Sequence, residues 1–74
     1  MRFPNKETVE RIRKQYPKGM RVELVTMLDP YTKLKPGDQG TVDCVDDTAT
    51  VFVIWDNGST LGAVYGEDVI KRLP

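Results

Sequence analysis

Residues 50–59 of the 74-residue chain read TVFVIWDNGS, and this pattern predicts a β-hairpin in a small β-rich fold. Six consecutive β-branched or aromatic residues, which are typical of a strand, lead into Asn-Gly, which is typical of a hairpin turn. Side chains alternate between the two faces of a strand, so this strand has two apolar faces. One face carries Phe52 and Ile54, and the other carries Val51, Val53 and Trp55. One of these sets must be covered by something other than the core.

Two registers are open to the hairpin. A two-residue turn at 57–58 pairs Trp55 with Thr60, whereas a three-residue loop at 56–58, with Gly58 in the left-handed region, pairs Trp55 with Ser59. We favour the three-residue loop because it places the apolar side chains of the next strand on the same face as Trp55. The predicted interior then consists of Val22, Leu24, Val42, Cys44, Val51, Val53, Trp55, Leu61, Ala63 and Ile70.

The whole chain reads as one helix followed by five strands, one of which is the strand described above. Asn5 is a favourable N-cap, and Pro17 and Gly19 end the predicted helix near Tyr16. Short segments rich in β-formers and separated by Gly, Pro and Asp predict strands at 21–27, 40–45, 49–55, 59–64 and 69–73. We therefore predict a mainly β single domain, in which a basic N-terminal helix (1–18) precedes a small five-stranded barrel (19–74).

Composition narrows the functional classes. The chain is 39% hydrophobic and 30% charged, has one cysteine and has no histidine. No apolar run approaches the ~18 residues of a membrane span, and the N-terminus lacks the apolar region of a signal peptide. We therefore expect a soluble cytoplasmic protein without a membrane partner. With no histidine to activate Cys44, we expect an inert core cysteine, no enzyme, no cofactor and no metal site.

Charge is divided unevenly although the net charge is zero. Residues 1–21 hold seven cations and two acids, whereas residues 22–74 hold four cations and nine acids. One interpretation is that the basic helix binds nucleic acid through a face formed by Arg11, Lys14 and Lys18. The other, which we favour, is that the helix lies against its own acidic body or a neighbouring acidic surface.

Five motifs resemble a known family. In order along the chain they are YPKGMRVEL (16–24), DPY (29–31), PGDQGTV (36–42), WDNGS (55–59) and GED (66–68). They are similar to a family of short bacterial and phage proteins of unknown function, domain of unknown function 4314. The resemblance implies an SH3-like barrel and a bacterial or mobile-element origin, but no activity. It also implies polar residues where Phe52 and Ile54 stand, and it leaves the N-terminal helix outside the shared pattern.

Two surfaces could bind a partner. In an SH3-like barrel, Tyr31, Trp55 and Tyr65 would come together as a peptide or ligand surface, unless Trp55 belongs to the core. Phe52 and Ile54 need a cover, which is either the apolar stripe of the helix, which we favour, or a second copy of the chain. We therefore expect a non-enzymatic interaction module that binds a protein or peptide, or forms a homodimer. The alternative is a nucleic-acid-binding accessory protein.

Overall fold

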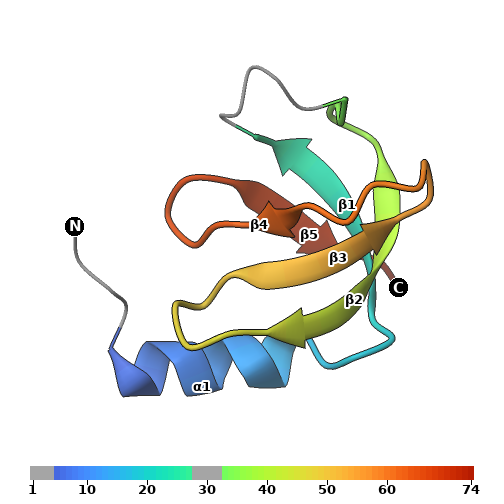
Figure 1. Cartoon of the computed structure of the whole chain (residues 1–74). Coiled ribbons are helices and arrows are strands. Elements are labelled where there is room, and N and C mark those ends of the chain that lie inside the picture. The colour runs from blue at the N-terminus through green and yellow to red at the C-terminus, as the bar shows by residue number, and fades with distance from the viewer. Residues whose placement is uncertain (1–4, 28–32) are drawn as a thin grey trace.

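The computed structural model describes residues 5–27 and 33–74. It contains α1 (Lys6–Gln15), β1 (Arg21–Thr26), β2 (Gln39–Val45), β3 (Val51–Trp55), β4 (Gly62–Ala63) and β5 (Val69–Arg72). The strands form one antiparallel sheet in the order β4-β3-β2-β1-β5, which curves around the core (Figure 1). The predicted class, mainly β with one N-terminal helix, is confirmed. The assignment of the sheet to the SH3-like barrels stays a prediction.

The three-residue hairpin loop is confirmed. The Trp55 amide donates to the Ser59 carbonyl at 2.8 Å, and the Gly58 amide donates to the Trp55 carbonyl at 2.9 Å. Gly58 has a φ of +94°, the left-handed conformation that glycine adopts without a steric cost. Val51 then pairs with Ala63, as the favoured register requires. The predicted strand at 59–64 is nevertheless reduced to Gly62–Ala63.

The core lies on the inner face of the sheet. Trp55 is its largest fully buried side chain, only 1% exposed, and its indole Nε1 donates to the Leu61 carbonyl at 2.8 Å. Leu61 and Ile70 are partly buried and pack against the buried cluster. That cluster comprises Val22, Leu24, Leu34, Val42, Val51, Val53 and Trp55. Pairing the buried indole N–H of Trp55 with a carbonyl avoids the penalty of an unpaired donor in the core.

Cys44 departs from the prediction because β2 contains a β-bulge. Val42 pairs with Val53, but Cys44 pairs with Phe52, so Asp43 is the extra residue on β2. A bulge resets the alternation of side chains along its strand. Cys44 is therefore exposed on the outer face with Phe52, and its predicted place in the interior is wrong.

The helix packs against one end of the sheet, beside the turn that joins β2 to β3 (Figure 1). The Asn5 side chain accepts from the Thr8 amide at 2.8 Å, which caps the helix as predicted. Val9 is buried, and Ile12 and Tyr16 pack against the core. Within residues 5–27 and 33–74, no helix is long and apolar enough to cross a membrane.

The prediction that this helix covers Phe52 and Ile54 is wrong. The apolar stripe of α1 lies instead over inner-face residues that the curved sheet leaves open at its end, among them Val51, Ala63 and Ile70. Phe52 and Ile54 point away from the core and remain exposed. Burial of this apolar stripe against the core favours the observed position of the helix.

Candidate interaction surfaces

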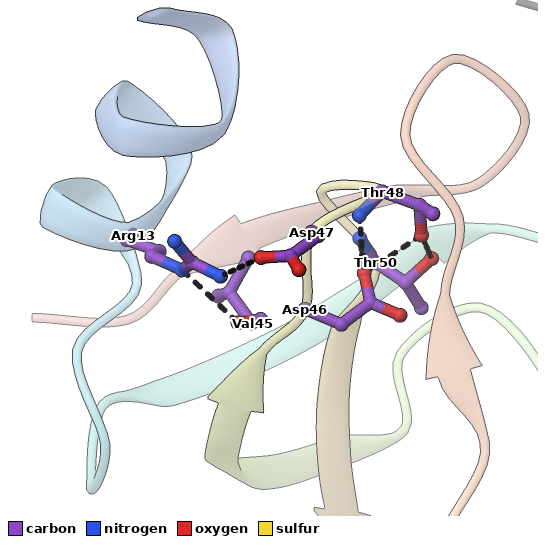
Figure 2. A network of polar contacts seen from close by, with 6 residues as sticks. All are labelled: Arg13, Val45, Asp46, Asp47, Thr48 and Thr50. Carbon is purple, nitrogen blue, oxygen red and sulfur yellow. Dashed lines mark hydrogen bonds and ion pairs between the residues drawn. The ribbon is translucent and has the colours of Figure 1, made fainter. Parts of the chain in front are cut away.

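Polar contacts tie the helix to the turn between β2 and β3 (Figure 2). Arg13 donates from Nε to the Val45 carbonyl at 3.2 Å and from Nη2 to the Asp47 carboxylate at 2.8 Å. In the same turn, Asp46 Oδ1 accepts from the Thr48 amide, the Thr48 hydroxyl and the Thr50 amide, at 2.9, 2.7 and 3.0 Å. The turn that receives the helix is therefore fixed by one carboxylate oxygen.

Replacing Asp46 by Ala is expected to destabilise the protein by about 1–2 kcal/mol, because three hydrogen bonds to the turn are lost together. Thermal unfolding at pH 7 measures this change. Asp46→Asn keeps one carbonyl oxygen and should lose less. Unchanged stability in Asp46→Ala would contradict this role of the carboxylate.

The same residue predicts a pH dependence. Burial acts to raise the pKa of Asp46, but hydrogen bonds from Thr48 and Thr50 outweigh it, so the pKa lies below the ordinary value of 3.8. The charged carboxylate therefore stabilises the fold above pH 3.8, and this stability is lost as the pH falls through the lowered folded-state pKa. Acid unfolding should be less steep in Asp46→Asn, and an identical acid profile would contradict the linkage.

The basic residues of the N-terminal segment are partly paired with the acidic body. Lys18 Nζ lies 3.9 Å from Asp43, and Arg21 forms a forked contact with Asp56 at 2.8 and 2.6 Å. The hydrogen bonds from Arg21 hold the pKa of Asp56 below its ordinary value. These pairs, together with Arg13 and Asp47, support the interpretation that the basic segment lies against its own body.

The three nucleic-acid candidates therefore do not form a uniform free face. Arg11 and Lys14 are exposed on α1, and no ion pair of either is found within the described residues. Lys18 follows the helix and faces Asp43. A carboxylate beside one of three cations weakens the attraction of this face for phosphate.

The predicted aromatic surface is not assembled as proposed. Trp55 belongs to the core, because the inner face of β3 carries it inward with Val51 and Val53. Tyr65 is exposed in the turn between β4 and β5. Tyr31 lies outside the described residues. Trp55 cannot present its ring to a ligand, so the three-residue surface needs correction.

Tyr65 instead borders a hollow of about 200 Å³ between α1 and the β4–β5 connection. Its other lining residues include Ile12, Tyr16, Val64, Val69 and Ile70. This hollow was missed in the sequence, where the helical spacing of Ile12 and Tyr16 was the available signal. It is the seam along which the helix packs on the sheet.

The outer apolar face is the second surface, and we define it as Cys44, Phe52, Ile54 and Thr60. Together with Asp43 and Val53, these residues line a hollow of about 420 Å³. Ile54 is 53% exposed and Phe52 is 36% exposed. The Phe52 ring lies over Gly62, where an added Cβ would be 3.1 Å from a ring carbon. Phe52 therefore also shields a glycine in β4, whereas Ile54 projects further into solvent.

Backbone groups near the two sheet edges are already hydrogen-bonded. Beside β4, the Leu61 carbonyl accepts from the Trp55 indole, and the Val64 amide donates to the Asp68 carboxylate at 2.8 Å. On β5, the Ile70 carbonyl accepts from the Tyr16 hydroxyl at 3.5 Å. Such contacts leave fewer backbone N–H and C=O groups available for pairing with an added strand. The edges are therefore less suited to binding than the outer apolar face.

Among residues 5–27 and 33–74, no group of three or more Cys, Asp or Glu side chains is placed to hold a metal ion. Cys44 is exposed, and the sequence has no histidine that could serve as its base.

Comparison with known proteins gives one result. The family model described as Domain of unknown function (DUF4314) matches residues 5–73. No curated protein and no solved structure matches the chain. The matched range includes α1, so the expectation that the helix lies outside the shared pattern is wrong.

Proposed function

Because the chain belongs to this family of unknown function, whose description names no activity, we propose from its surface that it is a small non-enzymatic interaction module that binds a protein. The observation that carries the proposal is the outer apolar face, where Ile54 and Phe52 remain exposed on the side of β3 opposite the core. Isolated apolar side chains are common on surfaces, whereas these two large side chains line one hollow together, which supports a contact site at this face.

Burial of Phe52 and Ile54 against a partner favours association. From their exposed fractions, Phe52 and Ile54 present on the order of 150–200 Å² of apolar surface. Covering it contributes about 4 kcal/mol at ~25 cal/mol per Å², before the entropic cost of association. The face can therefore anchor a partner, while polar groups at its rim supply orientation.

The topology, the composition and the motifs of the chain support further parts of the proposal. The order and antiparallel pairing of the five strands support an SH3-like barrel. A single cysteine in a small chain supports a reducing cytoplasmic location. The motif resemblance supports a bacterial or phage origin. The absence of histidine from the sequence supports a role other than catalysis.

Ile54→Glu tests the proposed function because it places a charge on the outer apolar face. Tagged wild type should capture at least one protein from cells of the encoding organism that Ile54→Glu captures at least tenfold less, since a buried unpaired charge opposes binding. Val69→Glu is the matched control, because Val69 is 48% exposed and lies on β5, outside this face.

Retention of the captured protein by Val69→Glu would place the contact at the outer apolar face. If wild type and Ile54→Glu capture the same proteins in equal amounts, the proposed function is wrong. Circular dichroism of both variants shows whether they are folded, and Ile54→Ser replaces Ile54→Glu if the charge prevents folding.

A further inference from the structure

We infer that the occupant of the outer apolar face is a second copy of this chain, related to the first by a two-fold axis. The inference rests on the proposed function, because it names the partner of the same face. An interface across a two-fold axis must be complementary to itself, since both subunits contribute the same residues. The distribution of charge around the face meets this condition.

An ion pair within the chain lies near each end of the face. At the Ile54 end, Arg21 contacts both Asp56 and the hydroxyl of Thr41, which is paired with Ile54 in the ladder. At the other end, Asp43 precedes Cys44, which is paired with Phe52. Lys18 lies 3.9 Å from Asp43.

An antiparallel arrangement of the two β3 strands brings opposite ends together. Ile54 of one copy then packs against Phe52 of the other, and each Arg21–Asp56 pair meets a Lys18–Asp43 pair. The cation and the carboxylate at each end are already paired within their own chain, so the ends that meet do not repel each other as two ends of the same net charge would. The net charge of zero also removes long-range repulsion between copies.

Other occupants from the same chain are less suitable. The helix packs against the end of the sheet through Val9 and Ile12 and is held there by the hydrogen bonds of Arg13, so it does not cover the outer apolar face. Edge-to-edge pairing of two sheets is opposed by the hydrogen-bonded groups beside β4 and on β5, and by Lys71 and Arg72 along β5. Face-to-face contact leaves all these interactions in place.

The small apolar area predicts a weak dimer. Stable interfaces bury about 800 Å² on each partner, several times the apolar area that Phe52 and Ile54 expose. We therefore expect a dissociation constant between about 10 μM and about 1 mM, so that the protein is monomeric when dilute and dimeric when concentrated.

Cys44 provides a direct test, because it is the sole cysteine and lies exposed within the face. A short bismaleimide should join two wild-type chains through Cys44, with a yield that rises with protein concentration. Ile54→Glu should reduce this yield at least tenfold. In the control Cys44→Ser/Val69→Cys, the only thiol lies on β5, and the concentration-dependent product should be absent.

Light scattering near 1 mM gives the second measurement and should report a mass above that of the monomer. A monomeric mass, together with no Cys44 cross-link, would overturn the dimer. If Ile54→Glu still abolishes capture of a different protein, only the identity of the partner is wrong and the proposed function stands. If capture is also insensitive to Ile54→Glu, both proposals fail.

Discussion

Replacing Trp55 by Ala is expected to unfold most of the protein at 25 °C. Trp55 is 1% exposed and is the largest fully buried side chain. Truncating such a residue costs about 3–5 kcal/mol, because apolar contacts are lost and a cavity remains. The Leu61 carbonyl also loses the indole donor that lies 2.8 Å away. A domain of this size has a total stability of about 5 kcal/mol, so little remains.

Urea unfolding followed by far-ultraviolet circular dichroism measures this effect without relying on the removed fluorophore. Trp55→Phe is the matched control, because it keeps most of the ring volume and loses the hydrogen bond. It should remain folded, with a loss of about 1–3 kcal/mol. A Trp55→Ala protein that unfolds cooperatively with nearly wild-type stability would show that Trp55 is not the centre of the core.

Gly40→Ala is expected to be nearly as damaging, although it adds a single methyl group. The added Cβ would lie 2.6 Å from Val53 Cγ1, 2.8 Å from the Ile54 carbonyl oxygen and 2.9 Å from Trp55 Cα. Two of these atoms are backbone, so relief requires β2 and β3 to separate where Gly40 pairs with Trp55. We expect a loss of about 3 kcal/mol or more, measured by the same urea titration.

Gly66→Ala separates this steric effect from the general cost of replacing glycine. Gly66 has a φ of +85°, and an added Cβ would meet nothing within 4 Å. Only the backbone conformation is then penalised, by about 1–2 kcal/mol. If Gly40→Ala is no more harmful than Gly66→Ala, the close approach of β2 and β3 at Gly40 is not present in solution.

Local patterns in the sequence were sufficient for most of the fold. The alternation in residues 50–59, with Gly58 available for the left-handed position, predicted the hairpin register and the inward direction of Trp55. Asn5 and Pro17 predicted the helix ends. These features depend on residues that are neighbours in the chain, which is why sequence patterns report them.

Cys44 and the position of the helix depend on distant parts of the chain and were not predicted correctly. The bulge at Asp43 arises from the pairing of β2 with β3, and the composition of β2 alone does not indicate it. The stripe of α1 was recognised, but which apolar surface it covers depends on how the finished sheet curves. Val9 and Ile12 therefore cover the end of the core, while Ile54 is left exposed.

The candidate site was predicted in part for the same reason. The outward direction of Phe52 and Ile54 follows from strand alternation, whereas the contribution of Cys44 to that face follows from the bulge. The aromatic surface failed at Trp55, because an aromatic residue at a strand end fits either a groove or a core. Its inner neighbours Val51 and Val53 favoured the core.

Chemical-shift mapping of the wild-type protein, from about 10 μM to about 1 mM, shows directly whether two copies meet at the outer apolar face, since this range spans the expected dissociation constant. We expect concentration-dependent amide shifts centred on Cys44, Phe52, Ile54 and Thr60, with much smaller shifts along α1 and at Val69. Shifts that are absent throughout this range, or that concentrate on α1, would contradict the outer apolar face as the surface on which two copies meet.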